Sequence, residues 1–154
     1  MAKIVFIFNF AGEMGRILAL DYGTKRTGVA VSDPLRIIAG ALATVPTAEI
    51  VPFLRQYMAE NSVDVVVLGK PLQMSGAPSA TWPAIEALAG GLQREFPEVK
   101  VVFYDERFTS VLARRAMIES GVPKMARRDK ALADRISATI ILQGYMESLG
   151  ENSS

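Results

Sequence analysis

The side chains that could carry out hydrolysis in this sequence are mainly carboxylates, because its 154 residues include no histidine and no cysteine. This composition excludes disulfides, thiolate metal sites, cysteine nucleophiles, histidine general bases and imidazole-bound zinc. Carboxylate oxygens suit a hard divalent ion, so Mg²⁺ or Mn²⁺ is the cofactor compatible with this chemistry. The lack of cysteine is also consistent with a cytoplasmic protein.

Asp21 is the first candidate. It follows the apolar run Ile17–Leu20 and precedes a turn that contains Gly23. A carboxylate at the end of a buried strand is costly unless it is hydrogen-bonded, ion-paired or bound to a cation. Asp21 is therefore either a metal ligand or a cap of the turn through backbone N–H groups.

Asp105 and Glu106 follow a second apolar run, Val99–Tyr104. Adjacent residues of a strand point to opposite faces, so we expect only one of the two carboxylates to reach a site at the strand end. Which one does so depends on where the strand ends. The alternative is an acidic cluster at the start of a following helix, with Thr109 as the N-cap.

Asp134 starts a stripe that is otherwise apolar in the last predicted helix and comprises Ala138, Ile141, Leu142 and Tyr145. A helix-surface pair with Lys130 would contribute only about 0.2–0.5 kcal/mol. Because burying a charge costs more than that, a cation shared with other acids explains Asp134 better. Three carboxylates gathered at the end of a sheet would hold divalent ions and support phosphodiester hydrolysis.

The order of the expected elements shows how these acids could meet. Strands are expected at 17–20, 27–32, 37–45, 63–68 and 99–104, and helices after an N-cap at Thr47, at 82–96 and beyond 109 with a break near 121–123; residues 69–79 read as a loop. This order predicts an α/β fold with a mixed five-stranded sheet flanked by helices, its first three strands antiparallel and its later strands parallel. Ligand sites in such sheets lie beyond the carboxyl ends of strands, where Asp21 and the 105–106 pair fall.

The length of the chain predicts one domain. We expect it at residues 15–149, between an N-terminal extension at 1–14 and a flexible tail at 150–154. No apolar run approaches the roughly 20 residues that span a bilayer, so no membrane partner is expected.

Charge is distributed unevenly although the formal net charge is only +1. Between Arg107 and Arg135, eight basic residues face three acidic ones. Such a segment suits contact with a phosphate backbone, although a solvated helical face would have the same composition.

Four blocks of the sequence resemble, in order, the motifs of the bacterial YqgF (RuvX) family. The blocks are 16–34 (RILALDYGTKRTGVAVSDP), 65–76 (VVVLGKPLQMSG), 104–110 (YDERFTS), and 127–130 (RRDK) together with 134–143 (DRISATIILQ). Ser137 and Phe108 depart from the usual alanine and leucine of the family, and neither change removes a candidate ligand. The resemblance extends from Gly15 to about Met146.

The resemblance implies a ribonuclease H-like fold in which Asp21, Glu106 and Asp134 are the catalytic, metal-binding acids, with Asp105 as the other candidate ligand. The family is described both as Holliday junction resolvases and as pre-16S rRNA nucleases. We therefore expect a nuclease that matures the 5′ end of pre-16S rRNA. The alternatives are a Holliday junction resolvase, which would favour a homodimer, a non-catalytic RNA-binding or transcription-associated module, and a nucleotide-binding phosphotransferase, for which the chain is too short.

The expected partner is structured RNA or branched DNA. Basic residues in the first turn, after the fourth strand and along the basic segment are candidates for contacts with its phosphates. They are Lys25, Arg26, Lys70, Arg107, Arg114, Arg115, Lys124, Arg127 and Arg128. For Lys70, an ordinary surface loop is an equally good interpretation.

Overall fold

Two apolar runs of the sequence form the centre of the sheet. The computed structural model describes residues 15–71, 80–105 and 130–152. In it, β1 (Arg16–Asp21) and β4 (Val63–Lys70) are parallel neighbours with buried central residues. Side chains on both faces of these strands are covered, which explains why their sequences read as nearly continuous Val, Ile and Leu rather than as an alternation of polar and apolar residues.

The remaining strands extend the sheet on both sides in the order β3-β2-β1-β4-β5. β2 (Arg26–Ser32) pairs antiparallel with β1, and β3 (Ala39–Pro46) pairs antiparallel with β2. On the other side, β5 (Lys100–Asp105) runs parallel to β4. The predicted mixed five-stranded sheet, with its first three strands antiparallel and its later strands parallel, is confirmed.

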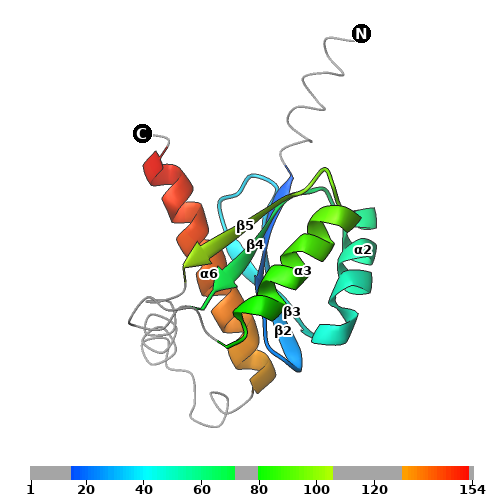
Figure 1. Cartoon of the computed structure of the whole chain (residues 1–154). Coiled ribbons are helices and arrows are strands. Elements are labelled where there is room, and N and C mark those ends of the chain that lie inside the picture. Colours follow the sequence, from blue (N-terminus) through cyan, green and yellow to red (C-terminus); the bar gives the residue numbers. More distant parts are fainter. Residues whose placement is uncertain (1–14, 72–79, 106–129, 153–154) are drawn as a thin grey trace.

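Helices cover the two faces of the sheet (Figure 1). On one face, α2 (Ile50–Glu60) and α3 (Trp82–Glu95) bury Leu18 and Leu20 of β1. On the other, α6 (Lys130–Asn152) buries Ile17 and Ala19 of the same strand. This alternation along β1 is the period of two expected of a strand. In all five strands, the face covered by α2 and α3 is called the α3 face, and the face covered by α6 is called the α6 face.

The third strand starts later than the sequence predicts. Ile37 and Ile38 were expected to be its first residues, yet they are 70% and 67% exposed and precede β3. Their N–H groups donate to Asp33 Oδ1 at 2.6 and 2.8 Å, so the side chain of Asp33 holds them in the turn after β2. The hydrogen bonds of the Asp33 side chain therefore determine the conformation of this segment, despite the β propensity of isoleucine.

The predicted N-cap at Thr47 is wrong. Thr47 is the first residue of a short 3-10 helix, η1 (Thr47–Glu49), and its hydroxyl donates to the carbonyl of Gly23 at 2.6 Å. Neither η1 nor α2 has a side-chain cap hydrogen bond. The Thr47 hydroxyl, which was expected to cap the helix, therefore bonds to the turn between β1 and β2 instead.

The last helix, α6, extends to Asn152, within the segment 150–154 that was expected to form a tail. The expected helical stretch from 110 to 129 and most of the expected loop, residues 72–79, lie outside the described residues, as does the N-terminal extension. None of the helices in the described ranges combines the length and apolar character needed to cross a membrane.

Candidate active site

Asp21 is the last residue of β1 and lies on the α6 face of the sheet. Ile17 and Ala19, four and two residues earlier, pack against α6, and the alternation of the strand continues to Asp21. Its cross-strand partner is Gly28 of β2. Directly opposed residues of an antiparallel pair present their side chains on the same face, so Gly28 is also turned toward α6.

Gly28 lets the first turn of α6 reach the sheet next to Asp21. A Cβ atom added at Gly28 would collide with the carbonyl group of Asp134 and would lie 3.1 Å from the Asp134 Cβ atom. The glycine is therefore required by a close approach of backbone to backbone. Asp21 and Asp134, which lie on elements at opposite ends of the chain, both adjoin this one residue on the same face of the sheet.

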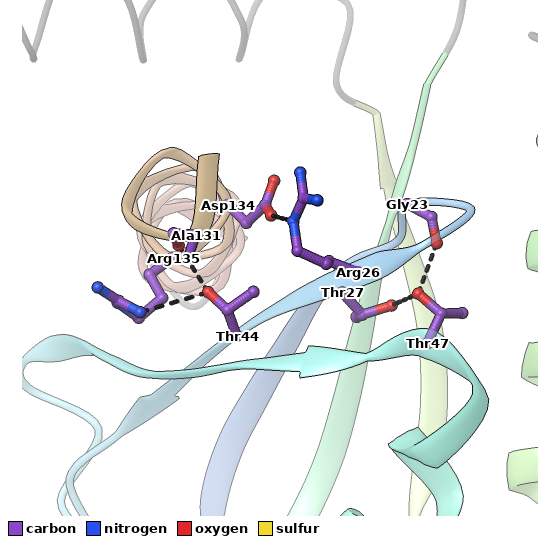
Figure 2. A network of polar contacts seen from close by, with 8 residues as sticks. All are labelled: Gly23, Arg26, Thr27, Thr44, Thr47, Ala131, Asp134 and Arg135. Atoms are coloured by element: carbon purple, nitrogen blue, oxygen red, sulfur yellow. Dashed lines mark hydrogen bonds and ion pairs between the residues drawn. The ribbon is translucent and has the colours of Figure 1, made fainter. Parts of the chain in front are cut away.

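The carboxylate of Asp134 has a cationic partner. Arg26 Nε, at the start of β2, donates to Asp134 Oδ2 at 3.0 Å, as Figure 2 shows. The apolar stripe that follows Asp134 is buried as predicted, with Ala138, Ile141 and Leu142 fully covered. The partner the structure gives is thus Arg26, 108 residues away in the sequence, rather than the nearby Lys130.

A threonine of β3 fixes the same turn of α6. Thr44 is the cross-strand partner of Gly28, and its hydroxyl donates to the carbonyl of Ala131 at 2.6 Å. Arg135 Nη1 in turn donates to the Thr44 hydroxyl at 3.5 Å (Figure 2). Asp21, Gly28 and Thr44 form a row across three strands, and α6 begins on top of this row.

The turn between β1 and β2 is held by two hydroxyls. Since Thr47 donates its proton to the Gly23 carbonyl, the fully buried Thr27 hydroxyl donates to Thr47 Oγ1 at 2.9 Å. The N–H of Thr47 donates to the carbonyl of Lys25 at 2.9 Å. These bonds fix the turn that carries Lys25 and Arg26. Sequence analysis did not single out Thr27 or Thr47 as supports of the site, because no local pattern marks a contact across 20 residues.

Lys70 and Asp105 lie on the opposite face of the sheet. They are cross-strand neighbours at the ends of β4 and β5. Lys70 is the last residue of a strand rather than part of a loop, and its Nζ lies 4.6 Å from the centroid of the Trp82 ring in α3. Phe103 packs edge-to-face on the same ring, so alternation along β5 places Asp105 on the α3 face as well.

The other predicted site residues fall between positions 106 and 128. Those outside the described residues are Glu106, Arg107, Arg114, Arg115, Lys124, Arg127 and Arg128. Within the described ranges, no group of three acidic side chains could hold a metal ion. The described part of the site therefore contains two acids, Asp21 and Asp134.

These two acids have the chemistry that a hard divalent ion requires. Both are carboxylates on one face of the sheet beside the same glycine, and oxygen ligands of this kind suit Mg²⁺ and Mn²⁺. A cationic group, the guanidinium of Arg26, already lies against Asp134.

The chain is similar to known proteins over most of its length. A family model described as RuvX, Holliday junction resolvase, matches residues 15–148. A protein of Parabacteroides distasonis is 51% identical over 135 residues, which cover 88% of this chain and 96% of the relative. A protein of Bacteroides thetaiotaomicron is 52% identical over 135 residues, covering 88% and 98%. Both relatives are named "Putative pre-16S rRNA nuclease".

Among solved structures, RuvC of T. thermophilus in complex with a Holliday junction substrate superposes with a TM-score of 0.50 at 17% identity, covering 86% of this chain and 96% of that one. This likeness supports the predicted ribonuclease H-like fold. The family match and the two relatives extend over the strands and the helix that carry Asp21, Arg26, Gly28 and Asp134. The chain belongs to the RuvX family.

Proposed function

We propose that this protein is a metal-dependent endonuclease that hydrolyses phosphodiester bonds in structured nucleic acid, and that it matures the 5′ end of pre-16S rRNA in the cytoplasm. The observation that carries the proposal is the approach of Asp134 to the Asp21 position across Gly28. It places two acidic residues, from the first and last elements, beside the same glycine on one face of the sheet. The names of the two relatives support the choice of substrate.

Asp21, Asp134 and Glu106 would hold the Mg²⁺ or Mn²⁺. When bound, such ions activate a water molecule and stabilise the oxygen that leaves the phosphorus. Asp105 was the other candidate for the third ligand. Because Asp105 lies on the α3 face, away from Asp21, the geometry of β5 favours Glu106.

The residues around the two acids set their positions. Thr44 holds the first turn of α6 on β3, and Gly28 removes the side chain that would lift this turn from the sheet. Lys25 and Arg26, in and after the turn between β1 and β2, lie at the side of the site that the substrate backbone would approach. The basic residues between 107 and 128 would extend this phosphate contact, whereas Lys70 faces α3 and is left out of the proposed surface.

The test is a cleavage assay with Mg²⁺ or Mn²⁺ on two substrates, a pre-16S 5′-leader RNA and a synthetic four-way DNA junction. We expect the leader RNA to be cut. Loss of a residue that only orients a metal ligand costs about 10- to 100-fold, so loss of a ligand itself, in Asp21→Asn, should lower the rate at least about 100-fold. Glu60→Gln, an exposed acid at the end of α2, is the matched control and should cut at the wild-type rate.

The outcomes separate the alternatives. Cutting of the junction alone would make the protein a Holliday junction resolvase, the second candidate, which the family description favours. A resolvase cuts two strands symmetrically, so it would also be expected to form a homodimer. Folded protein that binds RNA and cuts neither substrate would be a non-catalytic binding module.

A further inference from the structure

Arg26 forms an ion pair with Asp134, a residue that serves as a metal ligand in the proposed function. The contact joins Arg26 Nε to Asp134 Oδ2 at 3.0 Å. The contact uses Asp134 Oδ2, and a divalent ion that bound this oxygen would compete with the guanidinium for it. The structure therefore shows Asp134 paired with a cation of the chain itself.

The pair is suited to exchange. Its side chains are 39% and 25% exposed, and ion pairs with this degree of solvent contact are weak. By contrast, the position of Asp134 itself is fixed, because the carbonyl of Ala131 is bonded to Thr44 and the Asp134 backbone rests on Gly28. The carboxylate thus remains in place when the guanidinium moves.

We propose that Arg26 is an exchangeable counter-ion of Asp134, an inference that rests on the proposed metal-dependent function. Arg26 would give up Asp134 Oδ2 when a divalent ion is bound there, and its guanidinium would then be able to bind a phosphate of the nucleic acid. A guanidinium carries five N–H donors in a planar arrangement that matches phosphate oxygens, and the contact with Asp134 uses the Nε–H. Loading of the ion and binding of the substrate are thereby coupled through one side chain.

The first test measures Mn²⁺ affinity by isothermal titration calorimetry. We expect Arg26→Gln to bind Mn²⁺ about two- to fivefold more tightly than the wild type, because the ion no longer competes with the guanidinium. The matched control is Arg55→Gln, which removes an arginine paired with Glu95 on the α3 face. It should bind Mn²⁺ with the wild-type affinity, and Asp134→Asn should bind at least about tenfold more weakly.

The results distinguish failure of this inference from failure of the proposed function. Equal or weaker Mn²⁺ binding by folded Arg26→Gln, with clear binding by the wild type, would overturn the exchange and leave the metal-dependent nuclease intact. If the wild type bound no divalent ion, both proposals would fall.

A second test follows the arginine itself, by the ¹⁵N–¹H signal of its Nε group. On addition of diamagnetic Mg²⁺ we expect the Arg26 signal, assigned by its disappearance in Arg26→Lys, to shift while the Arg55 signal stays constant. An Arg26 signal that does not respond to saturating Mg²⁺ would show that the ion pair persists, contrary to the proposal.

A third test examines the phosphate contact with a synthetic four-way DNA junction and Ca²⁺, another hard ion that carboxylates bind. One phosphate contact changes the slope of log K against log salt concentration by about 0.9 on duplex DNA. The slopes of wild type and Arg26→Gln should differ by about this amount with Ca²⁺ and agree in EDTA. Equal slopes with Ca²⁺ would exclude the contact.

Discussion

The backbone of Gly28 lies directly beneath Asp134, with no space for a side chain between them. The distance between β2 and the first turn of α6 is therefore set by the absence of a side chain. Since Gly28 is also the cross-strand partner of Asp21, the same close approach places the Asp134 backbone beside the residue that pairs with Asp21.

Gly28→Ala should push α6 away from the sheet. We expect it to lower the free energy of unfolding by about 1–3 kcal/mol, as overpacking does. The cleavage rate should fall by more than the loss of folded protein explains. Urea unfolding and the cleavage assay measure the two effects. Gly40→Ala on β3 is the control, because its nearest neighbouring atom would be the Val31 carbonyl oxygen at 3.9 Å, and it should be neutral or slightly stabilising. Wild-type stability and activity in Gly28→Ala would contradict the close approach.

Thr44→Val should loosen the beginning of α6. The substitution keeps the shape of the side chain and removes the hydroxyl that bonds to Ala131, so it should cost about 0.5–1.5 kcal/mol of stability. Hydrogen exchange should accelerate in the first turn of α6 and remain unchanged in α3. Thr139→Val serves for comparison, because that hydroxyl bonds only within the helix, to the carbonyl of Arg135, and its removal should leave the first turn protected.

Thr27 and Thr47 should be energetically coupled. Thr47→Val would leave the buried Thr27 hydroxyl without its acceptor and should cost about 1–3 kcal/mol. In the double variant Thr27→Val/Thr47→Val that buried hydroxyl no longer exists, so the total loss should be smaller than the sum of the single losses by at least about 0.5 kcal/mol. A double-mutant cycle of urea unfolding measures the coupling, and strict additivity would show that the two hydroxyls act independently.

Asp33 should contribute to the acid sensitivity of the fold. The hydrogen bond from the Ile38 N–H, reinforced by that from Ile37, holds the pKa of Asp33 below its ordinary value of 3.8. Because the unfolded chain then binds the proton more readily, this stabilisation is present above pH 3.8 and is lost as the pH falls through the lowered pKa.

The matching variant is Asp33→Asn, whose neutral amide oxygen is a weaker acceptor. It should be less stable than the wild type near pH 6, and the difference should shrink in unfolding experiments at pH 3 and below. A difference that stays constant with pH would exclude Asp33 as the titrating group.

The sequence alone predicted much of this molecule because its signals are local. The apolar runs before Asp21 and at 63–68 determine the central strands, and the stripe after Asp134 determines the buried face of the last helix. Hydrophobic periodicity also predicts that these acids are close to the core. The face that Asp21 and Asp134 share follows from the pairing of β1 with β2 and from the packing of α6 on Gly28.

The contacts that hold the residues of the site in position could not be predicted, because they join residues that are far apart in the sequence. Arg26 was expected to contact only phosphate, and its bond to Asp134 depends on how α6 packs across β2. Thr47 was expected to cap a helix, but its hydroxyl bonds to the turn after β1. The choice between Asp105 and Glu106 depended on where β5 ends, and only the alternation along that strand places Asp105 on the α3 face.

The position of α6 over the first three strands also has a consequence for biosynthesis. Strands β1 to β5 precede residue 106, whereas Asp134 arrives with the last helix. A nascent chain that has emerged only as far as β5 therefore has its sheet residues and Asp21 but cannot assemble the pair of acids. Domains generally fold as units during synthesis, so the two acids meet only after α6 has been made and has packed on the sheet.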